Sequence, residues 1–308
     1  MHKNLRPWHV VAAVVLLCAA LTGILYLQRY WRRLDAAGMA AYAPAGAKAV
    51  AFIDVAALRK AGVLELIAGS RAVEESEYQR FVRETQFDYR TDLDAVLLAF
   101  LDGENYYLAA GRIRWSPLRD YISQTGGACW NAFCTTQSAQ PGRFLSFLPL
   151  RRDLLAVALS RNRFAAQHLA QAPRFKPQQA LPPDPVWVWL SEEALRSPEV
   201  YPPGTQLFIK ALQGSGGVTL ALGADGTRFR ARMLVTCRSD RDAEILVAQF
   251  ERITDVLRKM LSSSGLQPNP RDLSGVLTAG VFQRKGAEVS GEWPMERAFL
   301  EALSGGSY

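Results

Sequence analysis

Twenty consecutive uncharged residues form the apolar segment Trp8–Leu27, close to the start of the sequence. As an α-helix with about 1.5 Å rise per residue, this segment would be roughly 30 Å long, the thickness of a bilayer's hydrocarbon core. Basic residues flank it on both sides, and Tyr26, Tyr30 and Trp31 follow where aromatic rings favour the headgroup layer. The sequence therefore predicts a single-pass anchor in the lipid bilayer, which places the remainder of the chain beside a membrane.

Three other interpretations of this segment fit the residues less well. A cleaved secretory signal needs small residues at its end, whereas this segment ends in Tyr26, Leu27 and Gln28. A lipoprotein signal needs a small residue before its cysteine, but Leu17 precedes Cys18. A buried core helix is the third alternative, although basic flanks at the N-terminus are typical of an anchor. The Lys/Arg counts on the two sides are nearly equal and leave the orientation open.

The cysteines bear on the orientation. Cys129 and Cys134 are separated by four residues, a spacing that suits a small disulfide-closed turn between two short strands. A disulfide requires an oxidising compartment, so the pair favours a domain outside the cytoplasm at the cell membrane. Two unpaired structural cysteines remain the alternative. Cys18 and Cys237 have no evident partner, and we expect both to be unreactive apolar residues.

The basic charge is concentrated around the anchor. The whole chain has a net charge of +7, but residues 36–308 hold 31 basic and 28 acidic residues, a net of +3. This part of the sequence contains no Lys/Arg block with interleaved aromatic residues. A nucleic-acid partner is therefore not expected.

After the anchor the chain repeats itself. Each half follows the order strand, helix, hairpin, helix, hairpin, helix, beginning with the apolar strands 49–53 and 186–190. The first hairpin of each half turns at an Asp-Gly pair, at positions 102–103 and 225–226, which is a strong hairpin signal. The predicted divisions are a short tail (1–7), an anchor (8–28), a stalk (29–47), repeat one (48–171), a proline-rich linker (172–185) and repeat two (186–304).

The second hairpins and closing helices complete the predicted fold. We expect hairpins over 143–159 and 274–290, the latter turning at 284–286, and closing helices over 162–171 and 294–303. Hairpins with helices between them predict an α+β fold, with a transmembrane helix followed by two tandem repeats of antiparallel sheet covered by helices.

Two of the predicted helices carry additional information. Residues 240–263 place five apolar residues on one stripe at spacings of three and four, which predicts a core-covering amphipathic helix or a partner-helix seam. Residues 74–85 form a shorter predicted helix without a counterpart in the second half. The stripe consists of Leu246, Phe250, Ile253, Leu257 and Met260.

Few residues offer catalytic chemistry. His168 is the one histidine outside the anchor region, and the cysteines and histidines lack the ligand spacing of a structural zinc site, so we expect no metal and no cofactor. The glycine-rich stretch 214–217 precedes a strand, whereas a phosphate loop follows one, so it is expected to be a linker. Asp88, Asp92 and Asp94 could act as a general acid–base pair or hold a cation, or simply cap turns.

Aromatic residues are the candidate binding residues. Trp187 and Trp189 alternate on one strand and so face the same side of the sheet, and Tyr106, Tyr107 and Trp115 cluster around the first hairpin. Packed under a helix they would be ordinary core. Exposed, they would form an apolar surface for a partner protein, a glycan or a lipid.

A proline-containing stretch leads into an apolar strand that ends in Asp54-Val55 and a short Ala-Leu helix, between Pro44 and Leu58. In this stretch and in its duplicated α+β plan, the chain resembles a loose group of bacterial single-pass membrane-anchored proteins. The resemblance implies no activity and no site residues. The residues favour a non-enzymatic binding or accessory protein of the cell envelope. A carboxylate-dependent hydrolase using the three aspartates, or a carrier of lipids or other hydrophobic ligands, are the alternatives.

Overall fold

The structure is a computed structural model of the whole chain. The anchor predicted for residues 8–28 lies outside the residues that the structure describes. Within those residues, no helix is both long and apolar enough to cross a bilayer. The described residues are 34–64, 76–169, 173–176, 180–197, 201, 205–225 and 228–304.

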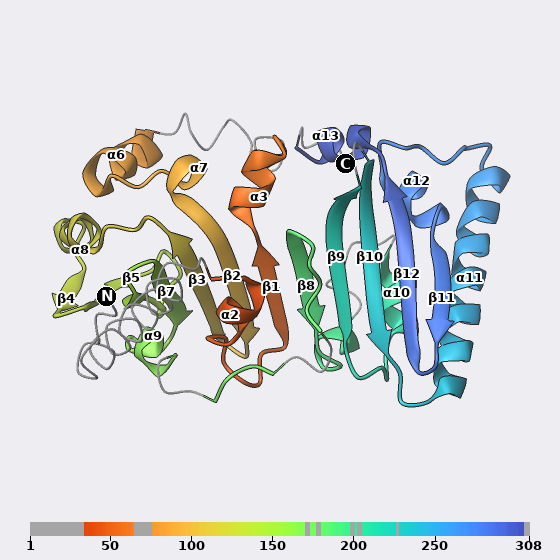
Figure 1. The fold of residues 1–308 in the computed structure, drawn as a ribbon, viewed down its shortest axis with the longest axis horizontal. Helices are drawn as coiled ribbons and strands as arrows, with labels where there is room; N and C mark the ends of the chain where they lie inside the picture. The colour runs from red at the N-terminus through yellow and green to blue at the C-terminus, as the bar shows by residue number, and fades with distance from the viewer. Residues whose placement is uncertain are drawn as a thin grey trace, which may run out of the picture. The chain divides into compact units, whose positions relative to one another are not determined.

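One antiparallel sheet runs through the unit formed by residues 36–308 (Figure 1). The order of its strands is β11-β12-β10-β9-β8-β1-β2-β3-β7-β6-β5-β4. The α+β class and the large antiparallel sheet are therefore as predicted. The strands in chain order are β1 (Ala49–Ile53), β2 (Leu93–Leu101), β3 (Glu104–Gly111), β4 (Ala128–Trp130), β5 (Phe133–Gln137), β6 (Phe144–Arg151), β7 (Leu154–Ser160), β8 (Val186–Leu190), β9 (Val218–Asp225), β10 (Arg228–Thr236), β11 (Val281–Lys285) and β12 (Glu288–Met295).

The opening strands of the two halves meet in the middle of this sheet. β1 and β8 pair antiparallel, with Ala51 opposite Val188 at the centre of both strands. Outward from this pair, the first half continues β2-β3-β7-β6 and the second continues β9-β10-β12-β11. The corresponding strands thus follow the same order on both sides. β5 and β4 extend the first half alone.

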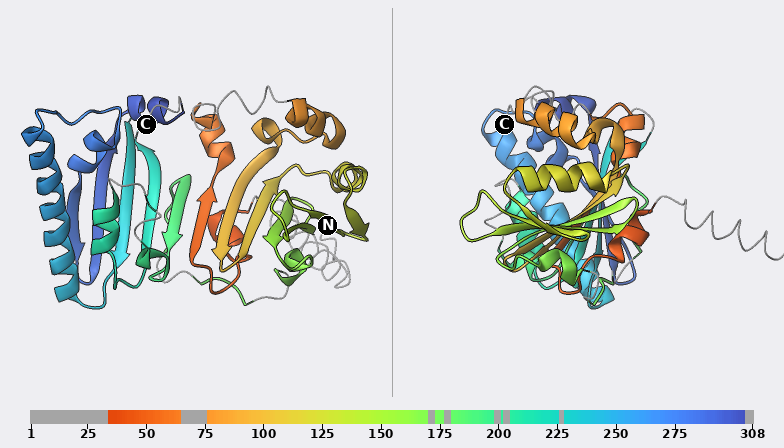
Figure 2. Two further views of the ribbon diagram at one scale, coloured as in Figure 1. Left: turned by 180° about the vertical axis from the view of Figure 1, so that it is seen from behind. Right: turned by 90° about the vertical axis from the view of Figure 1, so that its left-hand side faces the viewer.

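Helices cover both faces of the sheet. In the end-on view of Figure 2, α8 and α9 lie on opposite sides of the strands, and in the view from behind α10 lies in front of the strands of the second half, beside α11. The helices are α2 (Ala36–Ala40), α3 (Val55–Lys60), α6 (Ser76–Thr85), α7 (Tyr89–Asp92), α8 (Trp115–Gln124), α9 (Ala165–His168), the 3₁₀ turn η1 (Ala194–Arg196), α10 (Gln206–Ala211), α11 (Asp240–Ser263), α12 (Leu273–Thr278) and α13 (Arg297–Ser304).

The core of the second half lies between the sheet and α10, α11 and α12. Phe208 of α10 and Phe250 of α11 pack with ring centroids 5.7 Å apart, and Phe282 of β11 lies 5.0 Å from Phe250. Trp293 of β12 meets Phe282 edge to face at 5.4 Å. Such offset and edge-to-face contacts are the favoured arrangements of aromatic rings. This aromatic cluster fixes α11 along the edge of the sheet.

The expected strand at residues 274–278 was wrong, because this stretch is α12. Asp272 accepts a hydrogen bond from the backbone N–H of Ser274 at 2.7 Å, so its side chain caps the first turn of a helix. The hairpin consequently begins at Val281 and turns after Lys285, where Gly286 has a φ of +61°. The closing helix also starts later than expected, at Arg297, because β12 continues to Met295.

A disulfide joins Cys129 of β4 to Cys134 of β5. The two residues are directly opposite in the hairpin, and their Cα atoms are 4.1 Å apart. This hairpin turns over two residues, and Asn131 in the turn has a φ of +53°. It forms the free edge of the sheet at the end of the first half.

Candidate functional site

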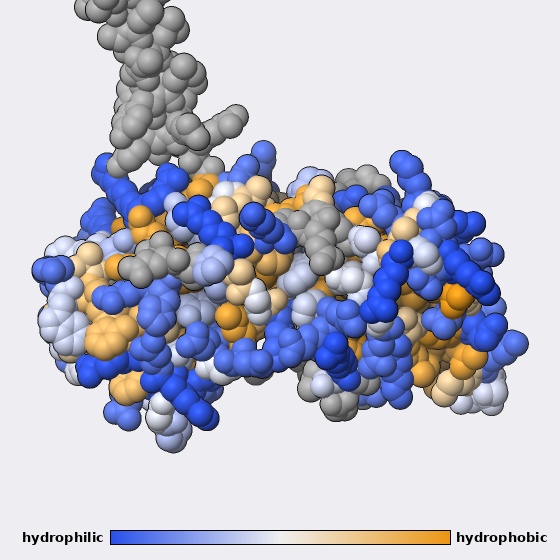
Figure 3. All heavy atoms as spheres, turned by 90° about the horizontal axis from the view of Figure 1, so that it is seen from below, coloured by the Kyte–Doolittle hydropathy of each residue, from blue (hydrophilic) through white to orange (hydrophobic). Residues whose placement is uncertain are grey.

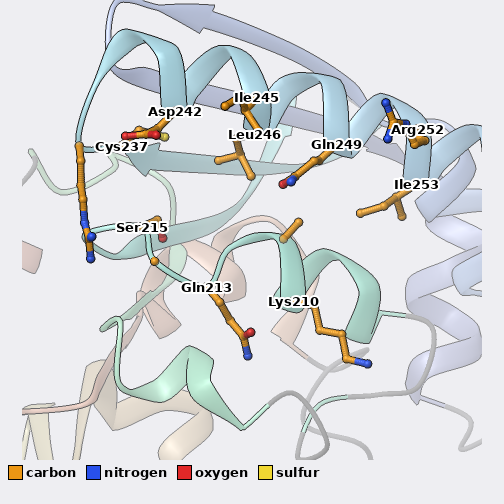
Figure 4. A pocket seen from close by; sticks show the side chains of 13 residues that line it. Lys210, Gln213, Ser215, Cys237, Asp242, Ile245, Leu246, Gln249, Arg252 and Ile253 are labelled. Atoms are coloured by element: carbon orange, nitrogen blue, oxygen red, sulfur yellow. The ribbon is translucent and has the colours of Figure 1, made fainter.

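A groove lies between α10 and α11 and is lined by residues of both helices and of the turn that follows α10. Its volume is about 620 Å³, within the usual range of ligand sites. Figure 4 shows Ile245, Leu246, Gln249 and Ile253 of α11 projecting toward α10. The groove is open to solvent along its length, so it resembles a channel for an elongated partner more than an enclosed chamber.

The α11 wall begins at a well-formed helix cap. Ser239 accepts a hydrogen bond from the backbone N–H of Asp242 at 3.1 Å and donates one to the Asp242 carboxylate at 2.8 Å. Both bonds stabilise the first turn, and the acidic residue there complements the helix dipole. The cap therefore holds the N-terminal half of α11 rigidly against the sheet.

A second apolar stripe on α11 faces solvent, and its first residue, Ile245, also lines the groove. Ile245, Val256 and Met260 are 47%, 43% and 58% exposed, and at 100° per residue all three lie within a narrow sector beside the buried stripe. Met260 was predicted to face the core and does not. α11 has 24 residues and is about 36 Å long, which is longer than the strands of eight residues or fewer beside it.

The opposite wall consists of α10 and the turn that follows it. Ser215 is buried and donates a hydrogen bond from its hydroxyl to the carbonyl of Leu212 at 2.8 Å. Gly214 has a φ of +90°, a conformation that glycine adopts without strain. Gly216 then donates to the carbonyl of Thr236 at 3.1 Å. The predicted linker at 214–217 is therefore a turn, and it also closes one end of the groove.

Basic side chains line the rim of the groove. Lys210 and Arg252 have no acidic group within ion-pair distance among the residues that the structure describes. Arg238 is 3.6 Å from Glu192, and Asp242 is the acidic residue of the lining. The lining thus combines an apolar floor with a net positive rim, which favours a ligand that carries both apolar and acidic groups.

Cys237 lies at the end of the groove near Asp242, as Figure 4 shows. Burial raises the pKa of its thiol, and the negative charge of Asp242 raises that pKa further. Both effects disfavour the thiolate, which is the reactive form of cysteine. The groove accordingly lacks an activated nucleophile at this position, and the Ser215 hydroxyl donates to a carbonyl instead of to a base.

The three candidate aspartates serve local structure. Asp88 caps α7, and its carboxylate accepts hydrogen bonds from Arg90 and from the Tyr78 hydroxyl at 2.8 Å. Asp92 forms an ion pair with Arg112 at 2.8 Å, while Asp94 lies in β2. No group of three His, Cys, Asp or Glu residues is placed to hold a metal ion in the described part of the chain.

Hydrogen bonds from Arg90 hold the pKa of Asp88 at about 2, well below its ordinary value, despite an opposing effect of burial. The pKa of Tyr78 is raised, first by burial and then by its bond to Asp88. A carboxylate held this strongly in its ionised form is suited to an ion pair and ill suited to general acid catalysis at neutral pH.

The aromatic residues proposed as an exposed binding surface are largely core. Trp187 is fully buried, Trp189 and Tyr106 are less than one-tenth exposed, and Tyr107 and Trp115 are half-buried. Trp189 meets Phe175 edge to face at 4.9 Å, so the chain that follows the first half covers it. Of the two alternatives, packed core and exposed surface, the burial of Trp187, Trp189 and Tyr106 fits packed core, because strands near the middle of this sheet are covered on both faces.

The surface is mostly hydrophilic in the view of Figure 3, where small hydrophobic groups are separated by polar side chains. The residues of the groove come from two separate segments, 210–215 and 237–253, so their proximity is not evident from the sequence. One signal was available: Ile245 and Val256 are apolar residues outside the expected stripe of α11. The expected stripe predicted the buried face of α11, and these two residues were the only sign of a second apolar face, which is exposed.

No protein-family model matches the chain, and no curated protein matches it in sequence. Solved structures do resemble it. Crystal form I of TP0453 superposes with a TM-score of 0.50 at 17% identity, over 86% of this chain and 94% of that chain. Crystal forms III and IV have TM-scores of 0.45 and 0.44 at 12% identity, each over 89% of this chain and over 96% and 95% of those chains. The likeness to form I concerns the fold alone.

Proposed function

We propose that this protein is a membrane-anchored, non-enzymatic binding or accessory protein of the cell envelope, and that the groove between α10 and α11 binds an amphipathic helix of a partner protein. The observation that carries the proposal is the exposed apolar stripe of α11 beside a groove with a basic rim. A helix with apolar residues at spacings of three and four would fill the floor, as in other helix-in-groove complexes.

The positive charge on the rim of the groove favours amphipathic helices that carry acidic residues. Lys210 and Arg252 project from opposite walls, so acidic residues on both flanks of a bound helix would meet a basic side chain. Complementary charge of this kind increases association rates and excludes partners of the wrong sign. The hydrophobic-ligand carrier finds less support, because the groove is open and its rim is charged. A carboxylate-dependent hydrolase has even less support, since Asp88 and Asp92 are engaged in local hydrogen bonds and an ion pair.

The proposed location rests on the anchor and on the disulfide. Residues 8–28 form the predicted span, and the Cys129–Cys134 bond is the chemistry of an oxidising compartment. The plan of two tandem repeats is also our proposal, supported by the same strand order on both sides of β1 and β8. Protease accessibility of the domain in intact cells tests the orientation.

Site-specific photo-crosslinking in intact cells tests the groove. A photoreactive residue replaces Gln249, which points into the groove, and a control replaces Glu251, which is exposed on the opposite side of α11. We expect an adduct with one protein from position 249 and none from position 251. Mapping of the adduct should place the bound residue in an acidic amphipathic helix, and Ile245→Glu should abolish it. An adduct with lipid only, or adducts from both positions, would contradict the proposal.

A further inference from the structure

A second candidate surface lies at the other end of the sheet, where an arginine contacts three aromatic rings. The Arg163 guanidinium carbon is 5.8 Å from the centroid of Trp130, 5.9 Å from that of Phe144 and 5.5 Å from that of Phe164. Trp130 is 49% exposed and Phe164 43% exposed, so this group faces solvent. We call Trp130, Phe144, Arg163 and Phe164 the aromatic–arginine surface.

Local bonds hold this surface in place without a partner. Trp130 and Phe133 stack with centroids 6.2 Å apart, and the disulfide closes the hairpin that carries both. The turn before α9 is fixed as well, because the side chain of Asn162 accepts a hydrogen bond from the backbone N–H of Phe164 at 2.9 Å. A surface ordered in advance loses little side-chain entropy on binding. Exposed tryptophan and arginine are also the residue types that dominate binding energy at interfaces.

The backbone of β4 is available beside these side chains. β4 is the last strand of the sheet and pairs with β5 on one side only, so its other side is a free edge. A Cα separation of 4.1 Å identifies Cys129 and Cys134 as a non-hydrogen-bonded pair, whose N–H and C=O groups point away from each other. Both main-chain groups of Cys129 therefore point to the free edge. No described residue bonds to them there.

The charge around this surface indicates the partner. Residues 121–183 contain seven lysines and arginines and a single acidic residue, Asp153, which pairs with Arg151 at 3.0 Å. This segment alone has a net charge of +6, so the rest of residues 36–308 is net negative. Arg161 and Arg163 have no ion pair within the described part of the chain. The segment contributes strands β4–β7 and α9, which include the aromatic–arginine surface.

We propose that this end of the sheet binds an extended acidic segment of a partner protein, which adds to β4 as a further strand. Its backbone would bond to the outward N–H and C=O of Cys129. Alternate side chains would lie over the aromatic–arginine surface, with an apolar residue against Trp130 and an acidic residue at Arg163. This is the strand-addition mode of peptide recognition, in which backbone bonds supply affinity and alternate side chains supply specificity. The proposal goes beyond the groove between α10 and α11 and is independent of it.

Fluorescence anisotropy with labelled synthetic heptapeptides and the full-length protein in detergent solution tests this proposal. The probe is EVEFEVE, compared with its lysine counterpart KVKFKVK and with the acidic probe methylated on its central amide. We expect saturable binding of the acidic probe only, with at least tenfold weaker binding after central methylation. Equal binding of the acidic and lysine probes, or an unaffected methylated probe, would overturn strand addition.

Matched variants locate the bound peptide. Arg163→Glu and Arg161→Glu change the net charge equally, but only Arg163 contacts the rings. We expect Arg163→Glu and Trp130→Ala to weaken binding at least tenfold, and Arg161→Glu to weaken it less than threefold, with unchanged thermal unfolding followed by far-ultraviolet circular dichroism in all three. Equal losses in the two arginine variants would contradict a local site. Binding to vesicles with 30% anionic lipid, in the absence of peptide binding, would identify a membrane instead and overturn the proposal.

Discussion

Phe52 of β1 and Trp187 of β8 stack across the junction of the two halves, with ring centroids 5.6 Å apart and planes 23° from parallel. The two residues are directly opposite in the ladder, and Trp187 is fully buried. This pair is therefore one of the contacts that join the strands of the two halves into a single sheet. Its loss should affect the stability of the whole unit.

Trp187→Ala is expected to lower the free energy of unfolding by about 3–5 kcal/mol, since it removes a large buried ring and leaves a cavity. Chemical denaturation followed by far-ultraviolet circular dichroism measures the change. Trp130→Ala serves as the control, because that ring is half exposed and should cost about 1 kcal/mol or less. Equal losses in the two variants would show that the junction does not depend on this ring.

Gly223→Ala is expected to destabilise the protein by about 1–3 kcal/mol, because the new methyl group would overlap the buried carboxylate of Asp184. Asp184 forms an ion pair with Arg232, so a shift of its carboxylate would disturb that pair. Thermal denaturation of both single variants and the double variant with Asp184→Ala provides the measurement. We expect the double variant to be more stable than the sum of the two single effects predicts; strict additivity would disprove the overlap.

Stability at acid pH should depend on Asp88. Its pKa is lowered from 3.8 to about 2 in the folded protein, so its contribution is complete above pH 4 and is lost as the pH falls through about 2. Asp88→Asn removes this dependence and should flatten the stability profile between pH 4 and 2. Urea denaturation at pH 7, 4, 3 and 2 gives the profile. An unchanged slope in the variant would show that Asp88 is not the titrating group.

Reduction of the disulfide should destabilise the β4–β5 hairpin. The bond closes a loop with a sequence separation of five, for which chain entropy predicts about 2 kcal/mol. Unfolding of the Cys129→Ser/Cys134→Ser double variant, compared with the parent under oxidising and reducing conditions, measures the effect. The variant should be insensitive to reductant. If the parent is equally insensitive, the bond does not contribute.

Cys237 should react slowly with thiol reagents. Its pKa is raised by burial and by Asp242, so little thiolate is present at pH 8. We expect alkylation by iodoacetamide to be at least tenfold slower in the native protein than in urea, and Asp242→Asn to accelerate the native reaction. The disulfide removes Cys129 and Cys134 from this assay, and Cys18→Ser in the parent and in the variant removes the remaining thiol. Native reactivity equal to that in urea would show an exposed thiol.

The hairpins predicted from the Asp-Gly pairs depend on local rules, and the flanking strands pair as expected, β2 with β3 and β9 with β10. Residue 226 of the second turn lies outside the described residues. The prediction of a strand at Ser274–Thr278 failed because periodicity alone does not separate a short helix from a strand. The capping of the first turn by Asp272 does separate them. The spacing of Cys129 and Cys134 likewise indicated a hairpin before the structure placed it at the sheet edge.

Neighbouring residues and their periodicity were enough to predict the antiparallel α+β class, most strands and the amphipathic character of α11, because these depend on contacts within about ten residues. Only the tertiary structure decided that β1 and β8 pair, that Trp187 and Trp189 are buried, and that Arg163 reaches Trp130 and Phe144. The paired residues of β1 and β8 are 133 to 141 positions apart in the chain, and Arg163 is 33 and 19 positions from Trp130 and Phe144. Burial and exposure on a sheet depend on which segment covers each face, and that is a property of packing, which local pattern does not contain.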